Sequence, residues 1–128
     1  MQNQEIDAQQ CRILRQADEI FKQQITKFAN AAIQEKNKLN VLRSEMSELV
    51  DELYKQETLR APADGSTGEI LASDISDKIS ILKNKISILE TRISYSAAEV
   101  IRFQDKADLA ANDAQNNVSK MKDLNCVV

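Results

Sequence analysis

The segment that decides the fold covers residues 75–121 and reads ISDKISILKNKISILETRISYSAAEVIRFQDKADLAANDAQNNVSKM. Its apolar side chains recur at alternating steps of four and three, beginning with Ile75, Ile79, Leu82 and Ile86. This spacing is a heptad repeat, lettered a to g, in which positions a and d form one apolar stripe along a helix. The stripe needs a partner helix to cover it, so the segment predicts one half of a coiled coil.

A second heptad repeat precedes the only proline of the chain. Asp18 at position a and Glu35 at position d interrupt it, but no glycine or proline does. A periodic helical pattern of this length is typical of a coiled coil rather than of an ordinary globular helix. The core residues that the two repeats predict are Phe21, Ile25, Phe28, Leu39, Leu42, Met46, Leu49, Leu53, Ile79, Leu82, Ile86, Leu89, Ile93, Val100 and Phe103.

The two repeats are separated by the segment APADGSTG, residues 61–68. Pro62 disfavours helical geometry at the residue before it, and Gly65 and Gly68 suit a loop. We therefore expect an all-α fold of two long helices, about 3–60 and 69–124, joined by a loop at about 61–68. A short loop between equal helices predicts an antiparallel coiled-coil hairpin, with residues 1–128 as a single domain.

The sizes of the core residues favour one register for this hairpin. With Phe28 opposite Ala107 and Ala32 opposite Phe103, large side chains meet small ones, which keeps the seam at constant width. The same register sets Asp18 opposite Asn117, so that two polar core positions match. Sliding the helices by one heptad would leave both core carboxylates against apolar residues, which costs several kcal/mol.

Two polar core residues stay unmatched in the favoured register. Glu35 faces an apolar residue there, and so does Ser96. We expect local loosening, or a bound water, at that point of the seam.

The alternative fold is intermolecular. Isoleucine at a and leucine at d, as in Ile79 to Leu89, favour parallel two-stranded coiled coils. The second helix would then pair with its own copy in a parallel oligomeric coiled coil. In that arrangement Ala107, Ala110 and Ala114 would stack on each other and leave a thin C-terminal half.

Two further apolar stripes lie outside the a and d positions. Both occupy position c, which a two-helix seam does not cover. They are ordinary exposed side chains, or they widen the interface within the hairpin, or they are docking faces for other helices. We expect docking, to a second copy or to another protein, and staggered pairing of one stripe with the other would build filaments. The predicted partner-binding residues are Ile6, Ile13, Ile20, Ile81, Ile88 and Tyr95.

Charge and hydropathy indicate that the partners are proteins rather than nucleic acids or membranes. The chain carries 17 basic and 20 acidic side chains and a formal net charge of −3. Both signs are mixed along the chain, so no basic stripe is present for phosphates and we expect no nucleic-acid binding. No apolar run approaches the roughly 18–20 residues of a membrane span, and the residues MQNQEIDAQQ do not read as a signal peptide.

Cys11 and Cys126 are the only cysteines. We expect two free thiols in a reducing cytoplasm, with a disulfide as the alternative if the chain folds back on itself. The predicted location is the cytoplasm, or alternatively outside it after export without a cleavable signal peptide.

Catalysis is not predicted. The chain contains no histidine, the commonest general base and nitrogen ligand, and its two cysteines lack metal-ligand spacing. Neither loop glycine belongs to a phosphate-binding motif. We therefore expect no enzyme activity, no metal and no cofactor.

Three classes of function fit these features. The first is a structural or adaptor subunit that assembles proteins through its apolar stripes. The second rests on a resemblance: a small hairpin without histidine or tryptophan, with helices rich in Asn, Gln and Ser, is similar to components of bacterial type III secretion machinery. That resemblance implies a stalk-like component beside the export ATPase or a self-assembling filament subunit. The third is a helical chaperone for a partner's amphipathic segment.

Overall fold

The computed structural model describes the backbone of residues 2–60 and 68–126 and the side chains of residues 7–59 and 73–126. These residues form two α-helices, α1 (Gln2–Arg60) and α2 (Gly68–Asp123), and no strand. Each helix begins one residue before its predicted start, and α2 ends one residue early. Residues 61–67 of the predicted loop lie outside the described part of the chain.

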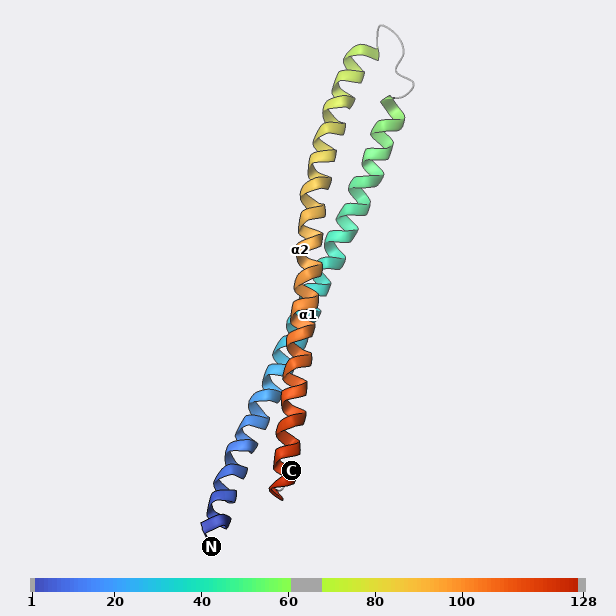
Figure 1. Ribbon diagram of the computed structural model, residues 1–128. Coiled ribbons are helices and arrows are strands. Elements are labelled where there is room, and N and C mark those ends of the chain that lie inside the picture. The colour runs from blue at the N-terminus through green and yellow to red at the C-terminus, as the bar shows by residue number, and fades with distance from the viewer. Residues whose placement is uncertain (1, 61–67, 127–128) are drawn as a thin grey trace. The chain divides into compact units, whose positions relative to one another are not determined.

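The chain divides into two compact units. Unit 1 combines Met1–Gln34 with Glu99–Val128, and unit 2 is Glu35–Ala98. Within each unit a segment of α1 packs antiparallel against a segment of α2, blue to cyan against orange to red in unit 1 (Figure 1). The predicted all-α antiparallel hairpin is therefore confirmed, and the parallel pairing is not the fold of this chain. The single domain over residues 1–128 stays a prediction.

The buried side chains fall on a and d positions of the two heptad repeats. The buried residues are Cys11, Ala32, Val100, Ala110, Asn117 and Met121 in unit 1, and Leu39, Ile79, Leu89 and Ser96 in unit 2. The other predicted core residues, from Phe21 to Phe103, are half-buried. A seam of two helices covers an apolar side chain from one direction only, so most of the core keeps some contact with water.

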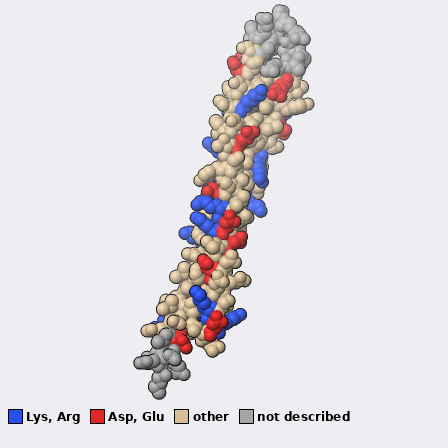
Figure 2. Space-filling view, in the orientation of Figure 1, with Lys and Arg blue, Asp and Glu red and all other residues tan. Residues whose placement is uncertain are grey.

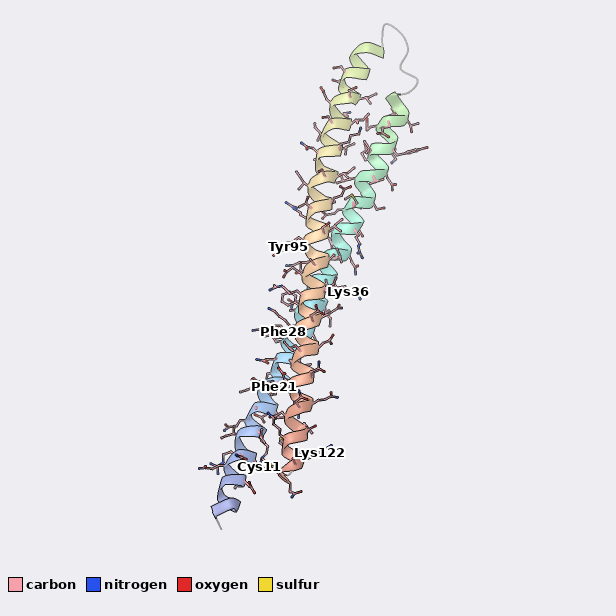
Figure 3. The ribbon with its side chains drawn as sticks, in the orientation of Figure 1. Cys11, Phe21, Phe28, Lys36, Tyr95 and Lys122 are labelled. Carbon is pink, nitrogen blue, oxygen red and sulfur yellow. A yellow bond between two sulfur atoms is a disulfide. The ribbon has the colours of Figure 1, made fainter. Side chains whose placement is uncertain are left out.

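Contacts in unit 1 agree with the predicted register. The ring of Phe28, labelled in Figure 3, has the Nζ atom of Lys106 5.4 Å from its centroid, and Lys106 is the sequence neighbour of the predicted partner Ala107. Lys27 lies near the same ring, at 5.7 Å. Sliding by one heptad would set Phe28 opposite Val100 instead, almost two turns away from Lys106. The half-buried ring thus contacts two cations as well as the seam.

The polar core position Asn117 is satisfied by the backbone. Its Nδ2 donates a hydrogen bond to the carbonyl oxygen of Leu14, 2.6 Å away across the seam. The carboxylate of Asp18, which the register sets opposite Asn117, forms an ion pair with Lys22 at 2.9 Å. Each polar group therefore has its own partner, and the two do not bond to each other.

The expected loosening around Glu35 and Ser96 is replaced by a direct hydrogen bond in unit 2. The Ser96 hydroxyl donates to the Glu35 Oε1 at 2.9 Å, and the Lys38 Nζ lies 3.7 Å from the Glu35 Oε2. Ser96 is only 3% exposed, so this bond forms away from water. The two residues lie one layer apart along the seam, and the length of the glutamate side chain bridges that distance. No buried side-chain nitrogen or oxygen of the described residues is left without a partner.

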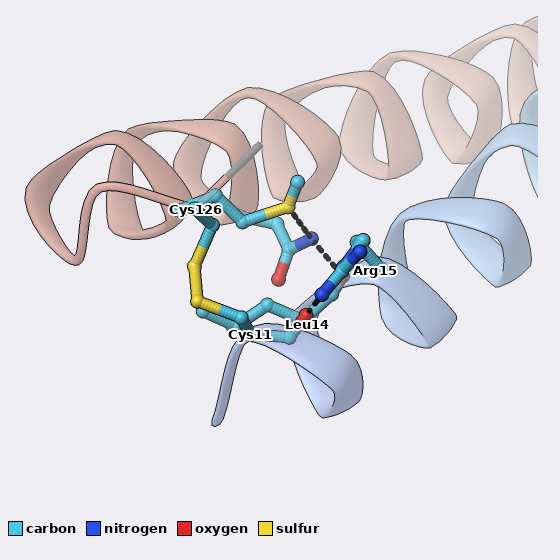
Figure 4. Close-up of a disulfide and its surroundings, with 6 residues drawn as sticks. Cys11, Leu14, Arg15 and Cys126 are labelled. Carbon is cyan, nitrogen blue, oxygen red and sulfur yellow. Dashed lines mark hydrogen bonds between the residues drawn. A yellow bond between two sulfur atoms is a disulfide. The ribbon is translucent and has the colours of Figure 1, made fainter. Parts of the chain in front are cut away.

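The expectation of two free thiols is wrong. Cys11 of α1 and Cys126, just beyond α2, form a disulfide across a sequence separation of 115 residues (Figure 4). Their Cα atoms are 5.6 Å apart, within the usual range for a bridge. The seam buries Cys11, and the close packing of the two helix ends in unit 1 brings the two sulfur atoms together.

The end of α2 explains how Cys126 reaches Cys11. Asn125 has a positive φ of 57°, the left-handed conformation that asparagine tolerates better than most residues. The Asn125 N–H donates to the Lys122 carbonyl at 3.0 Å, and the Cys126 N–H donates to the Met121 carbonyl at 2.8 Å. These two bonds form a Schellman motif, which ends the helix and turns the chain back over its last turn.

Candidate functional site

The apolar stripe of α2 in unit 2 is open to solvent. Ile81 and Ile88 are each 55% exposed, and Tyr95 is 68% exposed (Figure 3). Their neighbours at positions a and d turn toward α1, which leaves position c on the outside of the hairpin. Whether this stripe binds a partner stays a prediction, but the apolar area that it offers is accessible.

A shallow groove shows which side of unit 2 the stripe faces. It runs between α1 and α2, and its lining residues are Glu35, Lys38, Leu42, Thr91, Arg92, Tyr95 and Ser96. Lys38 and Arg92 occupy position g of their helices, and Tyr95 occupies position c. Position g of both helices, with position c next to it on each helix, therefore lies on one side of unit 2, which we call the c/g face.

On the c/g face of unit 2, α1 carries more acidic than basic side chains and α2 carries more basic ones. On α1 the exposed charged residues of this face are Glu45, Glu48 and Glu52, with Lys38 before them and Lys55 after them. On α2 the residues between and beside the apolar stripe are Lys78, Lys85 and Arg92, all exposed. The ion pairs within the described residues involve neither these three glutamates nor Lys78, Lys85 and Arg92. In the view of Figure 2, basic and acidic side chains are interspersed along the molecule.

The stripe of α1 in unit 1 has a different setting. Ile13 is 63% exposed and Ile20 is 53% exposed, whereas the side chain of Ile6 lies outside the described residues. The neighbouring g positions are Gln10, Ala17 and Gln24, which are uncharged. A second groove lies beside the disulfide and is lined by Gln10, Ile13, Leu14, Lys120, Asp123 and Leu124. This surface combines apolar contact from α1 with one charge of each sign from α2, Lys120 and Asp123.

Exposed apolar residues also lie at positions that the sequence analysis did not single out. Val41 and Leu109 also occupy position c, beyond Lys27 and Gln34 on α1 and beyond Arg102 on α2, with exposures close to those of the predicted residues. Extending the heptad letters beyond the first three repeats would have found both. The remaining ones lie at positions b, e or g and form no stripe: Ile33, Val50, Tyr54, Leu59 and Ile101.

These surfaces are made of apolar and charged side chains. The described residues contain no group of three or more His, Cys, Asp or Glu side chains placed to hold a metal ion. The groove of unit 2 holds Glu35 and Ser96, but these two groups bond to each other and form part of the seam. The c/g face therefore combines apolar area with charges of both signs, which suits recognition of another helix.

In comparisons with known proteins, no family model, no curated protein and no solved structure matches the chain. Over the residues that the structure describes, neither helix has a stretch long and apolar enough to cross a membrane.

Proposed function

We propose that this chain is a non-catalytic coiled-coil module that assembles proteins by packing helices against its exposed apolar stripes. The observation that carries the proposal is the row of Ile81, Ile88 and Tyr95, each more than half exposed on one face of a folded hairpin. Regularly spaced apolar residues on a helix that already has its own seam satisfied are the usual anchors for a further helix. Large exposed side chains of this kind cost solubility unless a partner covers them.

The charged side chains around the stripe support specific binding of a helix rather than nonspecific hydrophobic association. Three cations flank the stripe on α2, and on the same face of the neighbouring helix three carboxylates lie between Lys38 and Lys55. Charged rims around an apolar centre fix the register and the orientation of an incoming helix. The chain would therefore act as a structural or adaptor subunit with a defined docking face.

The disulfide favours one version of the second candidate function, the secretion-associated hairpin. Disulfides form and persist in oxidising environments and are rare in the cytosol. The pairing of Cys11 with Cys126 supports a location outside the cytoplasm, and so a filament subunit rather than a stalk-like component beside an export ATPase. Its exposed stripes would then join copies of the same chain.

In-cell photo-crosslinking tests the docking role without assuming the partner. A photoreactive phenylalanine derivative replaces Tyr95, whose ring is exposed, and adducts are detected in the cells that make the protein. We expect protein adducts that disappear when Ile81 and Ile88 are both changed to lysine. The matched control changes Ser80 and Ser87 to lysine, one position away and about 100° around α2, and should keep the adducts.

Two results would contradict the proposed function. One is the absence of any protein adduct at Tyr95, and the other is adducts that survive the double isoleucine change. Circular dichroism of the purified variants checks that the helices remain, since all four substituted side chains are exposed.

A further inference from the structure

We infer that the c/g face of unit 2 binds the same face of a second copy of this chain, giving a closed dimer with a four-helix core at that unit. The inference rests on the proposed function and adds the identity of the partner. Its basis is that one face carries both halves of a complementary pair: a cluster of three carboxylates on α1, between Lys38 and Lys55, and an apolar stripe edged with cations on α2.

The two stripes lie at the same level along unit 2. In the register of the hairpin, Met46 and Leu49 of α1 are set opposite Leu89 and Ile86 of α2. The carboxylates of Glu45 and Glu48 therefore lie on the segment of α1 that is level with residues 85–92. A complementary surface on another molecule must repeat this spacing, and a second copy of unit 2 does so.

Symmetry decides how two copies meet. With a two-fold axis parallel to the helices, α1 of each copy faces α2 of the other, antiparallel and at the same level. The carboxylates of one copy then meet Lys85 and Arg92 of its partner, and Val41 comes level with Tyr95. With the axis across the helices, α1 would face α1 and set carboxylates against carboxylates, which is repulsive. The charges thus favour the first arrangement.

The charged groups are available for this contact. Glu45, Glu48, Lys85 and Arg92 are exposed and make no hydrogen bond or ion pair within the described residues. Because residues 45–52 of α1 and residues 78–92 of α2 carry opposite signs on this face, each dimer contains the charge contact twice. Apolar contact by Ile88 and its stripe neighbours would supply the dehydrated centre of the interface, and the charges its rim.

Charge exchange between two variants tests the inference. The first variant carries Glu45→Lys and Glu48→Lys, and the second carries Lys85→Glu and Arg92→Glu. Sedimentation velocity over a wide concentration range should show a dimer for the natural chain and a monomer for each variant alone. An equimolar mixture of the variants should restore the dimer, because each α1 then meets an α2 of opposite sign.

The apolar centre is tested by Ile81→Lys with Ile88→Lys. We expect the dissociation constant to rise about 100-fold or more, since each change removes an interface anchor worth about tenfold. The control, Ser80→Lys with Ser87→Lys, should leave the dissociation constant within a few-fold of that of the natural chain. Helix content by circular dichroism should be unchanged in every variant.

The outcomes separate this inference from the proposed function. A natural chain that stays monomeric, a series of ever larger species, or a mixture that fails to dimerise overturns self-docking by this face. If Tyr95 nevertheless forms crosslinks to a different protein, the face does bind a partner, but that partner is not a second copy of the chain. If neither the dimer nor any adduct forms, both proposals fall.

Discussion

Removing the disulfide is the most direct test of how unit 1 is held together. The perturbation is the double substitution Cys11→Ser with Cys126→Ser, which keeps the size of both side chains and deletes one bond. That bond closes a loop with a sequence separation of 115 residues, almost the whole chain. In the unfolded chain such a loop restricts conformational freedom, so its removal stabilises the unfolded state.

The expected magnitude follows from the loop length. Loop-closure entropy grows with the logarithm of the number of residues enclosed, and for a loop of this size it amounts to about 16 cal/mol/K. At 298 K the free energy of unfolding should therefore fall by about 4.8 kcal/mol. Domains of this size are stable by only about 5–15 kcal/mol, so the loss is a large fraction of the total.

Urea unfolding followed by circular dichroism measures this loss. With a slope of about 2 kcal/mol/M, the midpoint of the double variant should lie about 2.4 M below that of the oxidised protein. The oxidised natural chain treated with a phosphine reductant serves as the control and should unfold with the double variant. A loss below about 1 kcal/mol, or titration of two free thiols in the oxidised protein, would refute the reasoning.

Two smaller perturbations test the polar seam and the helix end. Ser96→Ala removes the hydrogen-bond donor to the Glu35 carboxylate and should lower the free energy of unfolding by about 1.5–3 kcal/mol. The control Ser94→Ala, at an exposed serine, should change that free energy by less than about 0.5 kcal/mol. Equal effects of the two substitutions would show that the buried hydrogen bond contributes nothing to stability. Asn125→Val disfavours the left-handed backbone conformation at this position, so it should lower the equilibrium constant for forming the Cys11–Cys126 disulfide about tenfold. Asn125→Gly should not lower that constant, because glycine adopts the left-handed conformation readily. The constant is measured in glutathione buffers. If the three proteins had the same constant, the turn would not position the thiol.

Much of the fold could be predicted because it depends on a periodic pattern. Ile79 and Leu89 are buried because the repeat keeps them on one side of a helix, and Ile81 is exposed for the same reason. Residue sizes then favoured a register, since Phe28 needs a small residue opposite it. Periodicity alone therefore predicts which side chains face the seam and which face solvent.

The features that sequence reasoning missed depend on single groups rather than on a pattern. The disulfide needs Asn125 to take a positive φ, a local event that heptad letters do not describe. The bond between Ser96 and Glu35 needs a side chain long enough to reach the next layer, which a layer-by-layer register treats as a mismatch. The disulfide and the hydrogen bond each depend on the conformation of one residue, so they can be recognised only when the two helices are placed side by side.

The two units solve the same physical problem in different ways. A two-helix seam leaves most of its apolar side chains half-buried, so its own burial supplies limited stability. Unit 1 adds a covalent bond, which restricts the unfolded chain, and the apolar stripe there is flanked by uncharged Gln10 and Gln24. Unit 2 has no such bond within its described residues, and its stripe is flanked by charges of both signs. Additional helices packed on that face would complete the burial that the seam leaves unfinished. The covalent restraint thus lies in unit 1, and the docking face that we propose lies in unit 2.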